Sequence, residues 1–255
     1  MRPADCCGPR SFRDRNARDD PGRHTLLRGE LPGSIEIRPA DHQNRPVKWS
    51  PRKDNGHWPT GIPKPCIPTK AEAVPPGSLW LHEIKHDGYR LIVRRTGPEV
   101  RIITRGGYDW TSRYPAIVAA ALRLPAQHFI LDGEGVVEGD DGLPDFALLH
   151  SRRHDRCCHL VAFDLMQLGP RDLITLPLEM RKSLLSELLD GSTGGIVYAD
   201  HIDGDGAEIF AQACRLGCEG IVSKRRDKAY ASGPCKHWVK IKNPAAPAAL
   251  RFQEQ

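Results

Sequence analysis

Charged side chains recur at the ends of apolar, β-branched runs in this 255-residue sequence. Strand ends can converge on one cleft, so several such side chains in a single domain favour a shared site. Lysines neutralise phosphate oxygens, and carboxylates are the ligands that Mg²⁺ takes together with substrate phosphates. The pattern therefore indicates a site for a polyphosphate and a divalent cation. The residues that carry this pattern are Lys85, Glu134, Glu219, Lys224, Lys240 and Lys242.

Lys85 is the candidate nucleophile among them. It follows the apolar-rich run 79–84 and precedes the turn dipeptide Asp87-Gly88, after which a second β-rich run begins. This order predicts a hairpin with Lys85 at the mouth of the turn. A lysine attacks only as the neutral amine, and a reference pKa of about 10.4 keeps it protonated at neutral pH. We expect neighbouring cations and partial burial to lower that pKa; the alternative is a solvated lysine that meets none of the other charged residues.

The elements that must position these residues alternate between strands and helices from residue 79 onward. Glu134 lies in a β-rich run, 129–137, that glycine interrupts on both sides. The amphipathic pattern after Pro177 and the Asp205 cap favour helices. We predict further strands at 89–95, 100–104, 160–165, 219–224 and 237–242, and helices at 111–124, 178–189 and 205–216.

Composition bounds the class of protein. A hydrophobic fraction of 39% and a charged fraction of 27% are ordinary for a globular chain, and a net charge of +5 permits nucleic-acid contact without requiring it. The sequence has no apolar run of membrane-spanning length and no signal peptide, which predicts a cytoplasmic protein without a membrane partner. We expect a disordered extension at 1–57, one domain at 58–244 and a short tail at 245–255.

The cysteine pattern does not predict a metal site. His154, Cys157, Cys158 and His159 are close in sequence, which is compatible with zinc. The run from Cys157 onward, however, has the pattern of a buried strand, whose alternating side chains cannot all face one ion. Buried free cysteines are the preferred interpretation.

The segment around Lys85 resembles a known nucleophile motif. Residues 85–90, KHDGYR, match the K-x-D-G-x-R motif of the covalent nucleotidyltransferases, which include ATP-dependent DNA ligases, RNA ligases and capping enzymes. Further family motifs follow in order, and the resemblance covers roughly residues 65–244. It is greatest to the ligase domain of bacterial end-joining DNA ligases and their short stand-alone relatives. The further matching segments are TRGGYDW at 104–110, LDGE at 131–134, AFDL at 162–165, EGIVSKR at 219–225 and WVKIK at 238–242.

The resemblance implies a fold and a reaction. The fold would be α+β, ATP-grasp-like, of the DNA ligase and mRNA capping class, with antiparallel sheets flanked by helices. Lys85 would attack the α-phosphate of ATP and form lysyl-AMP. The AMP would pass to the 5′-phosphate of a nick in double-stranded DNA, which is then joined to the 3′-hydroxyl in DNA repair or recombination. Mg²⁺ or Mn²⁺ would assist.

The resemblance also implies roles for individual residues. Lys240 and Lys242 would steady the α-phosphate, and Asp87 would assist the later steps. Phe163 would stack on adenine, although a core phenylalanine is an alternative reading, and Arg181 would be structural. The remaining nucleotide contacts would come from Glu83, Ile84, Arg90, Arg105, Glu134, Glu219 and Lys224, with Glu134 and Glu219 binding the ribose or the metal ion.

Two departures from the family pattern leave alternatives open. Only residues 243–255 follow the last motif, too few for the OB-fold domain that usually comes next, so we expect no such domain in this chain and a partner protein that supplies it. The segment 231–237 also differs from the family pattern. The alternatives are an RNA ligase or capping-type enzyme, and a non-catalytic fragment that binds nucleotide or DNA ends. The oligomeric state stays open.

Overall fold

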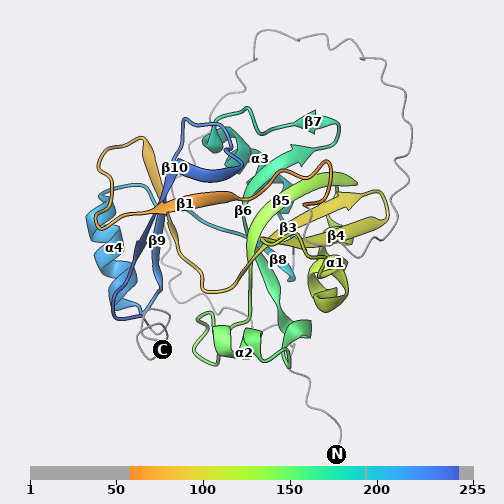
Figure 1. Ribbon diagram of the computed structural model, residues 1–255, viewed down its shortest axis with the longest axis horizontal. Coiled ribbons are helices and arrows are strands. Elements are labelled where there is room, and N and C mark those ends of the chain that lie inside the picture. Colours follow the sequence, from red (N-terminus) through yellow and green to blue (C-terminus); the bar gives the residue numbers. More distant parts are fainter. Residues whose placement is uncertain (1–57, 193, 247–255) are drawn as a thin grey trace, which may run out of the picture. The chain divides into compact units, whose positions relative to one another are not determined.

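The structure is a computed structural model that describes residues 58–192 and 194–246. The predictions for residues 1–57 and for 247–255 fall outside this part. The described chain forms two β-sheets with helices on their outer faces (Figure 1). None of the described helices is long and apolar enough to cross a membrane.

The first sheet has four strands in the order β1-β10-β9-β2. β1 runs parallel to β10, whereas the other pairs are antiparallel. Helix α4 covers one face of this sheet, where Ala213 packs with Ile221 and Ile241. The elements are β1 (Cys66–Lys70), β2 (Trp80–Ile84), α4 (Gly206–Arg215), β9 (Gly220–Arg225) and β10 (Gly233–Lys242).

The second sheet has the order β4-β3-β5-β6-β7, with β8 added in parallel to β6. Its outer face packs against α1 and α3 through a core that includes Leu91, Ile117 and Leu185. Its inner face shares a second core with the first sheet, in which Leu81, Ile130 and Trp238 meet. The elements are β3 (Tyr89–Thr96), β4 (Glu99–Thr104), α1 (Pro115–Arg123), β5 (His128–Val136), α2 (Phe146–His150), β6 (His159–Leu168), β7 (Arg171–Asp172), α3 (Leu178–Leu189) and β8 (Ile196–Tyr198).

The predicted hairpin around Lys85 is wrong. β2 pairs with β9 in the first sheet, and β3 pairs with β4 and β5 in the second, so the segment between β2 and β3 crosses from one sheet to the other. Gly88 permits the crossing, because a Cβ at this position would lie 2.3 Å from the carbonyl oxygen of Gly135. The Asp-Gly signal marks close backbone approach here and not a two-residue hairpin turn.

The other elements agree with the sequence patterns to different degrees. The predicted helix at 111–124 is split, because Pro115 begins α1 and holds Tyr114 outside the helical region. The Thr111 hydroxyl accepts from the backbone N of Ile102 and caps no helix. Helix α3 is confirmed, and α4 begins after the Asp205 cap as predicted. β5 is continuous through its glycines, β6 begins at His159 because residues 155–157 form a 3₁₀ turn, and β1, β7, β8 and α2 were not predicted.

Candidate active site

Lys85 stands at the start of the crossover between the sheets. Its backbone N donates to the carbonyl of Gly220 at 2.9 Å, which fixes it to β9. Its ammonium forms an ion pair with Glu219, and Glu219 also contacts Lys242 at 3.5 Å. The side chains of Lys85 and Lys242 are 21% and 35% exposed, so both remain open to a ligand.

The pairing of β9 with β10 brings the two last predicted motifs together. Lys242 lies opposite Gly220, and Lys240 lies opposite Val222. Gly220 has φ +136°, and a Cβ there would lie 2.0 Å from the carbonyl oxygen of Ile241. Only glycine fits at this position, which accounts for the Glu-Gly pair at the start of β9.

Positive charge gathers beside Lys85. Burial lowers the pKa of Lys240, and the cations of Lys85, Lys242 and Arg105 lower it further, whereas Glu219 acts in the opposite direction. These four cations therefore lie close enough to interact. A cluster of this kind suits the oxygens of a phosphate group.

Glu134 is the second carboxylate near the nucleophile candidate. It lies on β5 opposite Arg90. Burial raises the pKa of Glu134 to about 7, although the cations of Arg90 and Lys85 oppose the shift. The negative charges of Asp132 and Glu219 add to the rise. A group of opposite charge that enters here would hold the carboxylate in its ionised form.

A cavity of about 660 Å³ opens beside Lys85. Ile84, Asp87 and Glu219 line it together with Lys85. Further lining residues are Val136 and Val161 on β5 and β6, and residues of α2 and of the loop before it. A small molecule can thus reach Lys85 from solvent.

Three of the predicted nucleotide contacts lie instead in the core between the sheets. The Glu83 carboxylate accepts from Lys182 at 2.7 Å and from Lys224 at 2.5 Å, and all three side chains are less than 5% exposed. Burial alone would raise the pKa of Glu83, but the two lysines lower it. The Lys224 ammonium lies 4.1 Å from the ring centroids of both Phe163 and Trp238. The structure thus joins Glu83, Lys224 and Phe163 to one another and not to the cavity wall.

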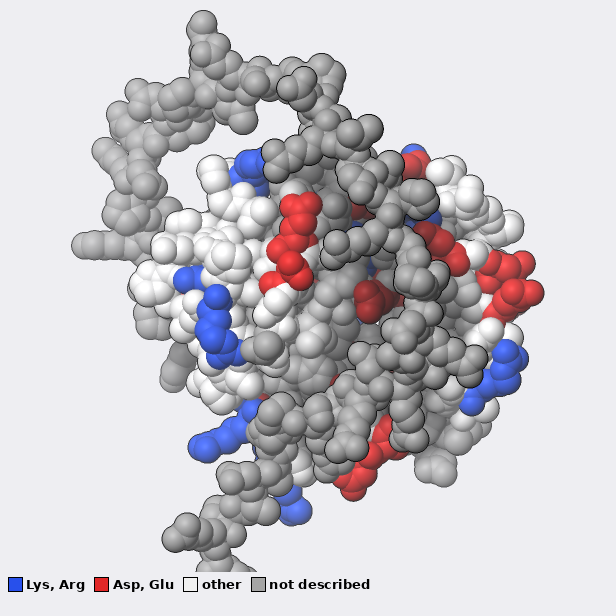
Figure 2. All heavy atoms as spheres, turned by 180° about the vertical axis from the view of Figure 1, so that it is seen from behind, with Lys and Arg blue, Asp and Glu red and all other residues white. Residues whose placement is uncertain are grey.

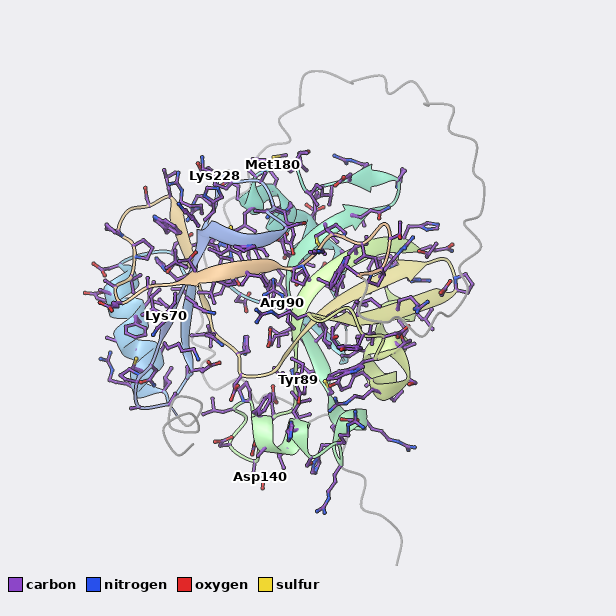
Figure 3. All side chains as sticks on the ribbon, viewed as in Figure 1. Lys70, Tyr89, Arg90, Asp140, Met180 and Lys228 are labelled. Carbon is purple, nitrogen blue, oxygen red and sulfur yellow. The ribbon has the colours of Figure 1, made fainter. Side chains whose placement is uncertain are left out.

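Arg90 lies in the space between the sheets (Figure 3). It donates to both carboxylate oxygens of Asp132, at 2.5 and 2.7 Å, and its guanidinium carbon is 4.4 Å from the Phe163 ring centroid. The Tyr230 hydroxyl donates to the same carboxylate at 2.6 Å. Arg90, which is predicted to donate to the nucleotide, is therefore already paired with Asp132.

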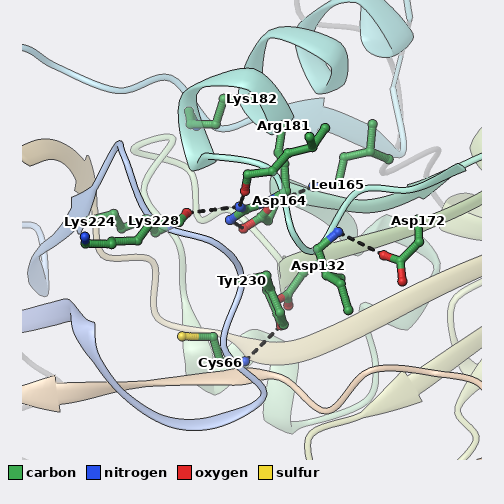
Figure 4. Close-up of polar contacts among 12 residues, drawn as sticks. Cys66, Asp132, Asp164, Leu165, Asp172, Arg181, Lys182, Lys224, Lys228 and Tyr230 are labelled. Carbon is green, nitrogen blue, oxygen red and sulfur yellow. Dashed lines mark hydrogen bonds and ion pairs between the residues drawn. The ribbon is translucent and has the colours of Figure 1, made fainter.

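Helix α3 carries two buried cations, Arg181 and Lys182. Arg181 is fully buried and donates to both oxygens of Asp164, at 2.7 and 2.8 Å, as Figure 4 shows. This agrees with its predicted structural role. Lys182, the partner of Glu83, received no role. A signal was present, because both residues share a helix face with Leu178 and Leu185 at spacings of three and four.

The site combines two sheets, a lysine on the crossover between them, and carboxylates and further lysines on adjoining strand ends. This arrangement defines a nucleotidyltransferase type of domain. A family described as "ATP dependent DNA ligase domain" matches residues 69–242. The chain belongs to this family. The resemblance to the ligase domain of bacterial end-joining ligases and the expected fold class are thereby confirmed.

Relatives and solved structures agree with the assignment. The chain is 38% identical over 167 residues to "Multifunctional non-homologous end joining protein LigD" of Mycobacterium bovis, covering 65% of this chain and 22% of the relative. It is 37% identical over 190 residues to the protein of that name from Pseudomonas aeruginosa, covering 72% of this chain and 22% of the relative. The structure of a mycobacterial DNA ligase D complexed with ATP and MES aligns with a TM-score of 0.63 at 34% identity, over 71% of this chain and 60% of that one. The chain thus spans about a fifth of the length of these two relatives.

Proposed function

We propose that this chain is the adenylation domain of an ATP-dependent DNA ligase that seals nicks in double-stranded DNA during repair or recombination in the bacterial cytoplasm. The observation that carries the proposal is the place of Lys85. It contacts Glu219, has three further cations beside it, and borders a cavity large enough for a nucleotide. The relatives named for non-homologous end joining DNA repair support the same reaction.

In the first step, the neutral amine of Lys85 attacks the α-phosphorus of ATP. A nitrogen–phosphorus bond forms, the bond to the bridging oxygen breaks, and pyrophosphate leaves. Lys240, Lys242 and Arg105 neutralise the charge that builds on the phosphate oxygens, while Glu219 orients the lysine. Positioning and charge neutralisation account for most of the catalysis in phosphoryl transfer.

In the later steps, AMP passes from Lys85 to the 5′-phosphate of the nick, and the 3′-hydroxyl then displaces AMP to join the strand. We assign Asp87, on the cavity wall two residues after Lys85, to assistance in these transfers. Ile84, which lines the cavity, would contact the adenine, and Glu83 would support it from the core through its pair with Lys224. Adenine would stack on Phe163 only where the Arg90 guanidinium moves from that ring to the ribose or phosphate.

Glu134 and Glu219 are the proposed ligands for Mg²⁺ or Mn²⁺. In the described part of the chain, no group of three or more His, Cys, Asp or Glu residues is arranged to hold a metal. Mg²⁺, however, usually takes one or two carboxylates and completes its shell with substrate phosphates and water. The half-buried Glu134, whose pKa rises to about 7, fits a cation that would keep it ionised. When bound, the metal would neutralise phosphate charge.

The direct test is intact mass spectrometry after incubation with ATP and Mg²⁺. We expect the wild type to gain the mass of one AMP and Lys85→Met to gain none. Lys236→Met, an exposed lysine on the same strand as Lys240, serves as the matched control and should form the adduct like the wild type. A wild type that forms no adduct, or a Lys85→Met that does, would contradict the proposal.

A substrate panel then decides among the alternatives. Nicked DNA, nicked RNA and hybrid duplexes are offered with the pre-adenylated protein, with and without an added OB-domain protein. Joining of DNA nicks supports the proposal, and joining restricted to RNA would favour an RNA ligase. DNA-end binding without any AMP adduct would identify a non-catalytic binding protein.

A further inference from the structure

On the uncovered parts of the face that Figure 2 shows, lysine and arginine side chains lie in separate groups, and acidic groups lie between some of them. One group of basic residues is local in the sequence. Residues 151–156, SRRHDR, form a turn directly after α2 that we name the arginine turn. Its three arginines, Arg152, Arg153 and Arg156, are all exposed.

The backbone of the arginine turn is unusual. Arg152 has φ +63° and is the sole non-glycine residue in the described part of the chain with a positive φ. Glycine and asparagine normally occupy this left-handed region, because a larger side chain is strained there. An arginine kept in this conformation is a reason to look for a function of its side chain.

The remainder of the turn is firmly held. Arg113 donates to Asp155 at 2.9 Å and to the carbonyl of Leu149 at 3.1 Å. Asp155 is thereby neutralised from outside the turn. None of the three exposed arginines forms an ion pair with a carboxylate in the described residues. Their charge is therefore available to an external anion.

The turn is also connected to the candidate active site. Tyr89, four residues after Lys85, has its hydroxyl 2.9 Å from Nδ1 of His150, the last residue of α2. The rings of Tyr89 and Phe146 lie 5.3 Å apart, and Phe146 lines the cavity that Lys85 borders. The arginine turn thus follows, within a few residues, a helix that forms a wall of that cavity.

We propose that the arginine turn binds the phosphodiester backbone of duplex DNA next to the cavity that holds Lys85. This deepens the proposed function and rests on it. Arginine presents a planar fork of donors that matches phosphate oxygens, and such contacts set the position of a protein on DNA without reading its sequence. Three arginines on one short, fixed turn would place the duplex relative to the nucleophile.

The test compares two triple variants by their binding to a duplex with a single nick, without ATP, over a series of salt concentrations. R152N/R153S/R156S removes the three charges, with asparagine chosen because it tolerates the left-handed backbone. R171S/R215S/K236S removes three exposed cations elsewhere and is matched in charge. We expect the first variant to bind about 100-fold more weakly at 0.1 M salt, with a log–log salt slope smaller by about three, and the second to stay within about twofold of the wild type.

Further measurements keep the outcomes separate. R152K/R153K/R156K retains the charges and should restore the salt slope, while thermal melts verify that each variant is folded. A wild-type slope in the first variant, an equal loss in the control triple, or stronger binding to duplex RNA would overturn the proposal. DNA binding is measured without ATP, so it does not depend on AMP adduct formation. Failure to form the adduct would refute the proposed enzyme activity, whereas the binding data would still decide whether the arginine turn contacts DNA.

Discussion

Two groups of lysine–carboxylate contacts in this domain differ in burial. In the core group, Glu83 is held by Lys182 and Lys224, and all three side chains are less than 5% exposed. In the cleft group, Glu219 contacts Lys85, which is 21% exposed, and Lys242, which is 35% exposed.

This difference in burial indicates which charges are available to a substrate. Burying a charge is costly unless partners compensate it fully, so the core group is saturated by its own members. Lys240 also belongs to the cleft group, because its charge interacts with those of Lys85 and Lys242. The group therefore has more cations than its one carboxylate can pair, and solvent reaches Lys85 and Lys242. Membership in a family motif does not separate the two groups, because Lys224 and Lys240 both lie in matching segments.

The largest expected effect comes from breaking a buried ion pair outright. Asp164→Asn leaves the fully buried Arg181 without its counter-charge, and we expect a loss of about 3–5 kcal/mol in the free energy of unfolding, measured by urea denaturation. Asp227→Asn breaks an exposed pair with Arg225 and should leave the denaturation midpoint unchanged. Equal effects of the two substitutions would remove the distinction between buried and exposed ion pairs on which the comparison rests.

The second prediction is that replacing Lys224 mainly lowers stability, whereas replacing Lys240 mainly lowers the rate of AMP adduct formation. Lys224→Met leaves Glu83 with Lys182 alone, so we expect the free energy of unfolding to fall by about 2 kcal/mol. Lys240→Met removes one of several like charges and should change stability by less than about 0.5 kcal/mol while it slows AMP adduct formation at least tenfold. Denaturation curves and timed intact-mass measurements on both variants test this. A destabilised Lys240→Met with normal adduct formation would contradict the assignment of Lys240 to the cleft.

The smallest effect concerns the residue next to the nucleophile candidate. Burial lowers the pKa of His86 to about 4 from its ordinary 6.5, although the charge of Glu83 opposes the shift. Below pH 6.5, His86 is therefore protonated in the unfolded chain but stays neutral in the folded chain. The free energy of unfolding thus decreases as the pH falls toward 4. We expect the wild type to lose about 1–2 kcal/mol more than His86→Asn between pH 7.5 and pH 5, measured by urea denaturation at each pH. Parallel pH profiles would show that His86 is accessible to protons in the folded state.

Sequence patterns predicted the elements whose signals are local. Helix α3 follows from its apolar spacing after Pro177, and α4 from the Asp205 side chain, which accepts from the backbone N of Ala207 at 2.8 Å. The break at Tyr114 was also encoded, since Pro115 disfavours a helical residue before it. β1 was missed because a Pro-rich segment has no alternating pattern, and it gains its stability from pairing with β10, more than 160 residues away.

The sequence by itself determined the family, the motif order and the choice of Lys85, because residue types at fixed spacing are a property of the chain alone. Tertiary structure alone decided that β2 joins β9 and not β3, and that the carboxylate beside Lys85 belongs to Glu219, 134 residues away. It also decided that Lys224 lies in the core whereas Lys240 lies near Lys85 and Lys242. The physical reason is that periodicity specifies which face of a strand is buried, but long-range packing selects the strand that pairs with it and the charges that this pairing brings into contact.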